Sequence, residues 1–346
     1  MVTQQVIAPP ARAALFLVLT VREGSEEVVR ELLADLSGLT RSVSFRTPTD
    51  HLDGVLGIGA LLWDRLFAAP RPKGLHPFDG LQGPRHVAPS TPGDLLLHVR
   101  AHHMDVCFEL GRQVVDRLRG HADVVDETHG FKYFDERDLL GFVDGTENPE
   151  GAAATAAVLI GGEDPDSAGG SYVIVQKYTH DLSSWGELPV HEQERVIGRS
   201  KLEDIEMTDA VKPVDSHVHL NTIVDPDGTE RQILRSNMPF GELGTGEFGT
   251  YFIGYAADPD VIERMLRNMF LGDPPGNTDR ILDFSTARTG SLFFVPTVDF
   301  LDDVPAGPGA ANAAASANAA ASANAAASTG PDRATASPVE ASVVLG

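Results

Sequence analysis

The segment Leu140-Gly141-Phe142-Val143-Asp144-Gly145-Thr146-Glu147-Asn148-Pro149 lies near the middle of the chain and separates two halves with similar patterns. Asp-Gly and Asn-Pro are dipeptides typical of turns, so the segment predicts a sharp turn after an apolar approach. Its two glycines let the backbone come close to a flat or bulky group. Such a turn would hold the Asp144 carboxylate at a fixed place, although an isolated Asp-Gly is more often an ordinary surface turn.

The half before this segment alternates predicted strands and helices. Residues 13–21 form an apolar run of strand length, and residues 26–36 carry apolar side chains at helical spacing. A second strand over residues 95–101 leads into a helix over residues 104–118. A proline-rich loop over residues 70–92 lies between these two pairs.

The half after the segment repeats this order. Strands are predicted over residues 171–178 and 249–256, with a shorter one over 232–237, and helices over 190–197 and 259–270. Strand, helix, strand, strand, helix is typical of a ferredoxin-like unit. We therefore predict an α+β fold of two ferredoxin-like halves, of the dimeric α+β barrel type, with antiparallel sheets and helices packed against them.

The sequence predicts four segments along the chain. An N-terminal arm covers residues 1–12, the two halves cover 13–130 and 131–304, and a tail rich in Ala, Ser and Asn covers 305–346. Its composition favours a flexible linker. The apolar end of the tail is either a docking peptide on a tether or an ordinary disordered terminus.

Composition excludes several classes of protein. A formal net charge of −23 argues against nucleic acid and anionic membrane surfaces as partners. The single cysteine, Cys107, excludes an internal disulfide and any multi-cysteine metal site. No apolar run has the length of a membrane span, and the N-terminus lacks the pattern of a signal peptide, so we expect a cytoplasmic protein.

Histidines offer candidate metal ligands. His217 and His219 would face the same side if their segment were extended, which suggests a two-histidine metal site. A single histidine acting as an axial ligand would instead suit haem. Both interpretations remain open on spacing alone.

Arg235 and Asn237 are placed on one face by the alternation of a strand. A permanently charged guanidinium beside a neutral amide forms a preorganised pair of donors. With a fixed carboxylate, such a pair is suited to cleaving a peroxide, because the carboxylate relays a proton while the arginine stabilises the charge on the leaving oxygen. Taken singly, each residue also fits a structural role.

The segment Gly141 to Pro149 resembles the signature of the dye-decolourising peroxidases, haem enzymes built from two ferredoxin-like halves. The resemblance covers about residues 10–303 and follows the order and spacing of the bacterial B-type branch. Four further blocks carry it: residues 215–217, 235–239, 275–284 and 290–296.

The resemblance implies one non-covalent haem b per chain, bound in the C-terminal half. His217 would be the proximal iron ligand, with His219 a neighbour without that role, and Asp279 would accept a hydrogen bond from the outer ring nitrogen of His217. The implied distal residues are Asp144, Arg235 and Asn237. Near the macrocycle the resemblance places Gly145, Thr146 and, as an apolar wall, Phe252.

The implied activity uses hydrogen peroxide to oxidise bulky aromatic or dye-type reductants through a ferryl porphyrin-radical intermediate. Reductants too large to reach a buried haem would pass electrons to it through aromatic residues of the protein. The candidates are Trp185, Tyr133 and Tyr251, although a role in packing explains them equally well. Manganese(II) is a further implied reductant, and the acidic residues that would bind it are Glu147, Glu206 and Glu230. The other interpretation of these carboxylates is an ordinary solvated acidic face.

The resemblance also implies partners. B-type members are often cargo of encapsulin shells, docked by a C-terminal peptide, and we expect a homo-oligomer. The alternative function is a haem-binding or haem-handling protein with incidental peroxidase activity. A cofactor-free α+β barrel would leave His217, Asp144 and Arg235 unexplained as a group.

Overall fold

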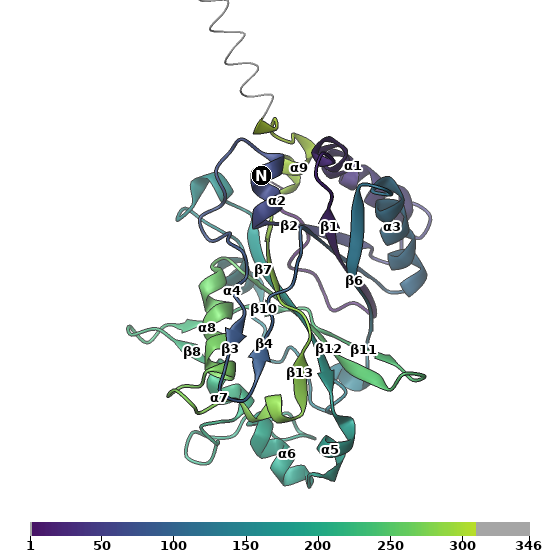
Figure 1. Ribbon diagram of the computed structural model, residues 1–346. Coiled ribbons are helices and arrows are strands. Elements are labelled where there is room, and N and C mark those ends of the chain that lie inside the picture. The colour runs from purple at the N-terminus through teal and green to yellow at the C-terminus, as the bar shows by residue number, and fades with distance from the viewer. Residues whose placement is uncertain (1, 309–346) are drawn as a thin grey trace, which may run out of the picture.

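A ten-stranded antiparallel sheet runs through the computed structural model, which describes residues 2–308 (Figure 1). Its strands come from both halves of the sequence: β1 (Ala13–Val21), β2 (Asp53–Gly59), β5 (Leu95–Ala101), β6 (Ala122–Phe131), β7 (Ser171–His180), β10 (Leu234–Arg235), β11 (Met238–Glu242), β12 (Glu247–Ala256), β13 (Ser285–Ala287) and β14 (Ser291–Val295). The order is β10-β12-β7-β14-β2-β5-β1-β6, with β11 beside β12 and β13 beside β7. Two small hairpins stand apart, β3 (Leu81–Gln82) with β4 (Val87–Ala88) and β8 (Ile223–Val224) with β9 (Glu230–Arg231).

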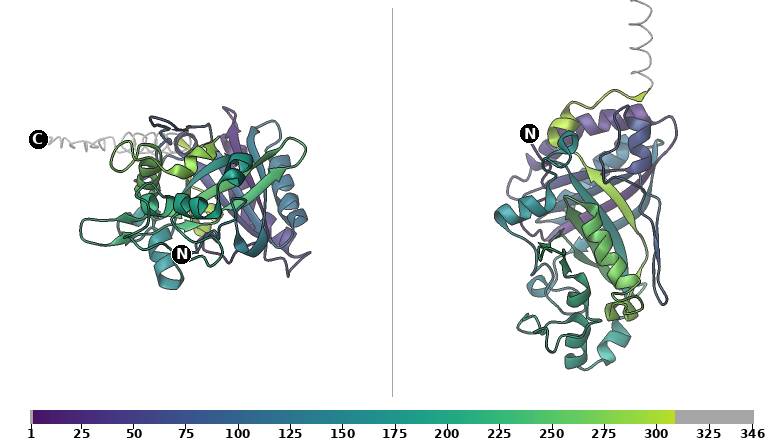
Figure 2. Two further views of the ribbon diagram at one scale, coloured as in Figure 1. Left: turned by 90° about the horizontal axis from the view of Figure 1, so that it is seen from below. Right: turned by 90° about the vertical axis from the view of Figure 1, so that its left-hand side faces the viewer.

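Helices accompany this sheet and complete the predicted α+β fold: α1 (Glu26–Ser44), α2 (Ala60–Leu66), α3 (Met104–Arg117), α4 (Gly151–Val158), α5 (Leu182–Glu187), α6 (Val190–Ile197), α7 (His217–Asn221), α8 (Pro259–Phe270) and α9 (Val298–Asp302). The long helices α1 and α3 cover the N-terminal strands, and α8 lies along the C-terminal ones (Figures 1 and 2). Between residues 2 and 308, no helix is both long and apolar enough to cross a membrane.

Several predicted boundaries differ from the structure. The first helix continues past residue 36 to Ser44, and the loop over residues 70–92 contains the β3–β4 hairpin. The strand predicted over residues 232–237 is reduced to Leu234–Arg235. Strand β6 was not predicted, because it is an edge strand whose side chains are mostly exposed and show no clear apolar face. The predicted tail, residues 305–346, lies almost entirely outside the described residues.

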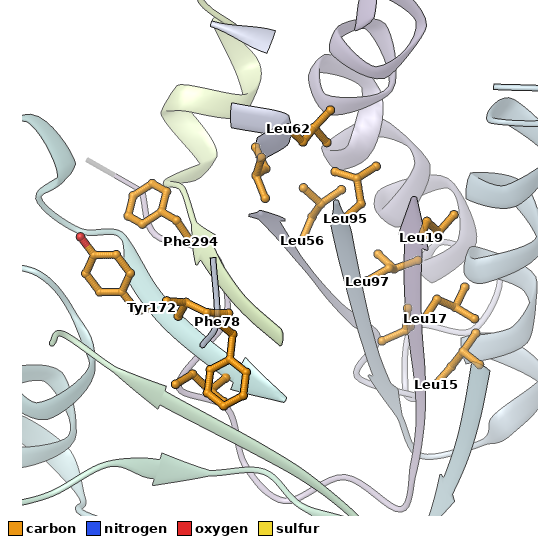
Figure 3. Close-up of a cluster of buried hydrophobic side chains, with 14 of the residues drawn as sticks. Leu15, Leu17, Leu19, Leu56, Leu62, Phe78, Leu95, Leu97, Tyr172 and Phe294 are labelled. Atoms are coloured by element: carbon orange, nitrogen blue, oxygen red, sulfur yellow. The ribbon is translucent and has the colours of Figure 1, made fainter. Parts of the chain in front are cut away.

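The two faces of the sheet bury two different apolar cores. The larger core joins the sheet to α1, α3 and α8. Figure 3 shows part of it, where leucines of β1, β2 and β5 gather on one face and Tyr172 and Phe294 continue the cluster into the C-terminal half. The second core lies on the opposite face and contains the aromatic residues Phe16, Tyr251, Tyr255 and Phe293.

The two halves join in one sheet where β14 pairs with β2. Phe293 lies opposite Gly59 in this pairing, and its side chain is 0% exposed. A Cβ at Gly57 would lie 2.9 Å from the Phe293 Cβ, and one at Gly93 would lie 2.8 Å from its ring. The Phe293 ring therefore fills a space that these two glycines leave open.

We predict that Phe293→Ala destabilises the protein by about 3–5 kcal/mol, because the rigid strands around the ring cannot close the cavity that it leaves. Urea denaturation followed by circular dichroism measures the change. The control is Phe45→Ala, since Phe45 is 87% exposed and its truncation should change stability by no more than about 0.5 kcal/mol. Equal midpoints for the two variants would contradict this account of the junction.

Candidate active site

A cavity of about 340 Å³ lies in the C-terminal half and gathers residues from distant parts of the chain. Its lining comes from the central turn, α7, α8 and the strands β7, β10 and β12. All but one of the predicted site residues line it: Asp144, Gly145, Thr146, His217, Arg235, Asn237 and Phe252. The exception, Asp279, lies behind His217 and is bonded to it.

The central turn has the predicted conformation. Gly141 and Gly145 adopt φ values of 92° and 86°, which favour glycine. The Asp144 backbone N–H donates to the Glu136 carbonyl at 2.9 Å, and the Asn148 N–H donates to the Gly145 carbonyl at 3.0 Å. The turn therefore holds Asp144 at the edge of the cavity, as the sequence indicates.

His217 is the first residue of α7, and its ring is tied down on one side. Its Nδ1 lies 2.7 Å from Oδ2 of Asp279, whose carboxylate is 0% exposed. The other oxygen of Asp279 accepts the Ile281 N–H at 2.9 Å, so the carboxylate is fixed in turn. In the part of the chain that the structure describes, Nε2 of His217 has no hydrogen-bond partner, which leaves this nitrogen available to a metal.

The two-histidine metal site is wrong. The segment is helical, because the chain turns into α7 at His217, and an extended arrangement with both rings on one side does not form. His219 is exposed and lies outside the cavity lining. Among residues 2–308 no group of three histidine, cysteine or acidic side chains could hold a metal ion. A five-residue helix is too short for hydrophobic periodicity to reveal it.

Asn237 fixes the Asp144 carboxylate. Its amide oxygen accepts the backbone N–H of Ile253 at 2.9 Å, which turns the NH₂ group toward the cavity. That NH₂ donates to Oδ2 of Asp144 at 3.0 Å. The orientation of the amide follows from both bonds, since the strand N–H can only meet an acceptor.

Arg235 is held through its backbone by Asn148. The Asn148 amide donates to the Arg235 carbonyl at 2.8 Å and accepts the Arg235 N–H at 2.9 Å. The guanidinium lines the cavity, and its buried Nε has no hydrogen-bond partner. Within residues 2–308 Arg235 forms no ion pair, so this half-buried arginine retains an unused donor at the cavity.

This donor set fits haem. The free Nε2 of His217 is a nitrogen donor of the kind that would hold a haem iron, and the unpartnered Nε of Arg235 is a donor that would remain for a small ligand. Apolar side chains suited to a flat macrocycle complete the lining: Phe252, Ile262, Met265, Leu266, Met269 and Ile281.

Asp138 also lines the cavity and was not predicted as a site residue. Its Oδ1 accepts the Phe142 N–H at 3.0 Å and closes the loop that leads to Asp144. Burial raises the pKa of Asp138 to about 7, and the negative charge of Asp144 adds to the rise. The available signal was the spacing Asp-x-x-Gly in residues 138–141, which is typical of a type I turn.

The acidic residues considered for manganese(II), Glu147, Glu206 and Glu230, all line the cavity. Two of them form ion pairs: Glu147 lies 2.5 Å from Arg199, and Glu206 lies 2.5 Å from Lys212. A manganese ion bound by these carboxylates would therefore compete with the side chains of Arg199 and Lys212.

The aromatic residues considered for electron transfer lie in different surroundings. Trp185 is buried and donates from Nε1 to the Leu140 carbonyl at 2.9 Å, which anchors the central segment. Tyr133 is partly exposed and packs against Phe134. Tyr251 is buried on the face of β12 that points away from the cavity.

Comparison with known proteins identifies the family of the chain. Residues 3–132 match a family model described as "Dyp-type peroxidase, N-terminal", and residues 135–300 match one described as "Dyp-type peroxidase, C-terminal". The chain is 62% identical over 312 residues to a dye-decolorizing peroxidase of Mycolicibacterium paratuberculosis, which covers 90% of this chain and 88% of the relative.

Solved structures are similar as well. The encapsulated DyP-type peroxidase of Mycobacterium smegmatis matches with a TM-score of 0.87 and 62% identity, over 89% of this chain and 99% of that one. A variant of DypB from Rhodococcus jostii RHA1 in complex with heme matches with a TM-score of 0.85 and 58% identity, over 86% and 97%. Two family models that together span most of the chain, and relatives at this identity, show that the chain belongs to the Dyp-type peroxidase family.

Proposed function

We propose that this protein is a haem peroxidase that uses hydrogen peroxide to oxidise bulky aromatic or dye-type reductants. The observation that carries the proposal is the unpaired Arg235 guanidinium beside the Asn237–Asp144 pair, in the same cavity as the free Nε2 of His217. The two-electron chemistry itself is supplied by haem when it is bound.

His217 and Asp279 form the proximal part of the proposed site. Asp279 accepts the hydrogen bond from Nδ1 of His217, which fixes the tautomer and keeps the lone pair of Nε2 for iron. An ionised carboxylate in this place also makes the imidazole a stronger donor. Gly145, Thr146 and Phe252 line the same cavity and would hold the macrocycle in this proposal.

Asp144, Arg235 and Asn237 act on peroxide in this proposal. Asp144 takes a proton from the proximal peroxide oxygen and returns it to the leaving oxygen, and Arg235 stabilises the negative charge that develops there. Asn237 keeps Asp144 in place for both transfers through its bond to Oδ2. We assign the proton-relay role to Asp144 and Arg235 jointly, because in the B-type branch that this chain resembles the arginine can matter more to peroxide cleavage than the aspartate.

A haem-handling protein is the other candidate. Such a protein needs the His217 ligand but has no use for a cationic donor kept unpaired in the cavity. A buried Nε–H without a partner is unfavourable to maintain, so its presence favours a reaction that develops negative charge.

Manganese(II) is included as an additional reductant on two grounds. Three acidic residues line one cavity in this chain, and a solved DypB variant that is 58% identical is in complex with manganese. The cation would displace Arg199 from Glu147 and Lys212 from Glu206. Oxidation of manganese(II) that survives alanine at all three positions would remove this part of the proposal.

We further propose a cytoplasmic homo-oligomer that is cargo of an encapsulin shell. The encapsulated relative from Mycobacterium smegmatis and the linker-like composition of residues 305–346 support the shell. The edge strand β6 has a sheet neighbour on one side only within the described residues. Its end at Gly130 packs against Met238 of β11, and the exposed remainder of the strand offers a surface for contact between copies. A monomeric mass in sedimentation would contradict the oligomer.

We predict that Arg235→Leu slows the reaction of the haem-loaded protein with one equivalent of hydrogen peroxide by about 10²–10³-fold, because a preorganised cationic donor is lost. Stopped-flow absorption of the haem band measures the rate. Arg264→Leu is the control, since Arg264 pairs with Asp225 at 2.7 Å outside the cavity and its loss should leave the rate unchanged. If peroxide merely bleaches the band, equally in wild type and Arg235→Leu, the haem-handling function is correct.

We predict a pH-dependent effect of Asp138→Asn on stability. The pKa of Asp138 in the folded protein, about 7, exceeds its value in an unfolded chain, so the stability it contributes is complete at low pH and is lost as pH rises toward 7. The asparagine variant, which cannot ionise, should gain stability relative to wild type between about pH 4 and pH 7. Urea denaturation across this range measures the difference.

The control for that experiment is Asp138→Ala, which removes the acceptor of the Phe142 N–H at every pH. It should be less stable than the asparagine variant throughout, because a buried donor loses its partner. If the difference in the free energy of unfolding between wild type and Asp138→Asn stays the same from pH 4 to pH 7, titration of Asp138 has no part in the effect.

We predict that deletion of residues 330–346 abolishes loading into an encapsulin shell when both proteins are co-expressed, because the docking peptide would lie at the end of the tail. Co-purification of the peroxidase with assembled shells measures loading. A substitution of Pro331 alone serves as the control for altered sequence without loss of the terminus. Loading that is indifferent to the deletion would remove the shell from the proposal.

A further inference from the structure

Four aromatic rings form a continuous column in the second core, on the face of the sheet opposite the cavity. Tyr251 stacks on Phe16 with ring centroids 4.1 Å apart, and Phe16 stacks on His98 at 4.8 Å. His98 stacks on Tyr255 at 6.2 Å. Both tyrosines and His98 are 0% exposed. The column crosses between the halves, because Phe16 and His98 belong to the N-terminal half and the tyrosines to β12.

One end of this column is a hydrogen-bonded tyrosine–histidine pair. The Tyr255 hydroxyl lies 2.8 Å from Nδ1 of His98. Burial lowers the pKa of His98 well below its usual value, and Arg100 adds to the effect, so the imidazole is neutral. A phenol is a better donor than an imidazole N–H, and an imidazole nitrogen a better acceptor than a phenol oxygen, so the phenol donates.

The column lies directly beneath the distal wall of the cavity. Strand β12 turns Thr250 and Phe252 toward the cavity and Tyr251 and Tyr255 toward the column, as alternation requires. In the pairing of β10 with β12, Arg235 is opposite Gly254 and Leu234 is opposite Tyr255. One strand therefore separates the tyrosines from the residues proposed to act on peroxide.

The other buried tyrosine near the cavity lacks a base. Tyr178 lines the cavity, but its hydroxyl donates to the amide oxygen Oε1 of Gln176 at 2.7 Å. An amide does not take up a proton at any working pH, whereas a neutral imidazole does. The Tyr251 hydroxyl forms no hydrogen bond of ordinary geometry. Burial raises the pKa of Tyr251 well above its usual value, and the nearby carboxylate of Asp126 adds to the rise. Of these three tyrosines, Tyr255 is the one whose hydroxyl is hydrogen-bonded to a neutral nitrogen base.

We propose that the Tyr255–His98 pair, with the stacked rings of Phe16 and Tyr251, is a buried redox site that donates an electron to peroxide-oxidised haem and holds the resulting oxidising equivalent as a tyrosyl radical. The inference rests on the proposed function, because the oxidant is the haem after its reaction with peroxide. In the absence of a reductant, the site takes the oxidising equivalent away from the haem, so that the residues lining the cavity are not oxidised.

The step is balanced. One electron leaves the Tyr255 ring for the oxidised haem, and the phenolic proton moves along the 2.8 Å hydrogen bond to Nδ1 of His98. The products are a neutral tyrosyl radical and an imidazolium. An oxidised phenol is a far stronger acid than imidazolium, so even this weakly basic histidine accepts the proton. An electron from an aromatic reductant restores the phenol, and the proton returns from His98 because its buried charge beside Arg100 is unfavourable.

The test uses the haem-loaded full chain, mixed with one equivalent of hydrogen peroxide without a reductant and frozen for electron paramagnetic resonance. We expect a tyrosyl signal in wild type that narrows when ring-deuterated tyrosine is incorporated. The signal should be lost in Tyr255→Phe and in His98→Gln, whose amide cannot take the proton. The control Tyr172→Phe, which removes a buried hydroxyl that accepts the Gly74 N–H at 2.8 Å, should retain it.

The haem absorption band is recorded on the same samples. A changed band with no radical in wild type would overturn the redox site while leaving the peroxidase function in place. A radical that persists in Tyr255→Phe and disappears in Tyr178→Phe would overturn it in favour of the cavity tyrosine. A haem band that does not respond to peroxide would overturn both the function and the redox site.

Discussion

The candidate site depends on the two hydrogen bonds by which the Asn148 side chain binds the backbone of Arg235. An amide that donates to one backbone group and accepts from the other imitates a neighbouring strand, and it ties the central turn to the end of β10. Without this contact, the turn that holds Asp144 and the strand that holds Arg235 would be joined through the Asn237–Asp144 hydrogen bond. The Asn148 side chain therefore fixes the backbone of Arg235 relative to the turn, and this fixes where the Arg235 side chain begins.

The same strands serve two faces with different chemistry. Toward the cavity, β10 and β12 present polar and charged groups that act on a small oxidant. Toward the second core, the next residues along β12 present stacked rings with few partners for their polar atoms. Alternation along an extended chain makes this possible, since adjacent residues point to opposite sides of the sheet. Strands β10 and β12 thus separate the residues proposed to act on peroxide from the aromatic residues of the second core, and the two groups remain one strand apart.

Much of this could be predicted from the sequence, because its signals are local. Apolar runs gave the bounds of β1 and β5, and helical periodicity gave those of α8. What escaped depends on tertiary context. The edge strand β6 buries little and shows no apolar face, and α7 is too short for periodicity. The role of Asp138 rests on its burial beside a second carboxylate, and no property of the residue itself reveals that. The residue roles at the site came from the resemblance to a family, not from spacing.

The pairing of β2 with β14 has a consequence for biosynthesis. It joins Ile58 to Phe294, so the sheet is completed only when nearly the whole folded part of the chain has been made. Until then β2 is an unpaired edge in a half that already has most of its core, and pairing over such a sequence separation is slow. Until β14 has been made, the N-terminal half exposes the backbone groups along one side of β2, and the junction between the halves forms late. Cells that make this protein rapidly would be expected to need chaperones more than its ordinary size suggests.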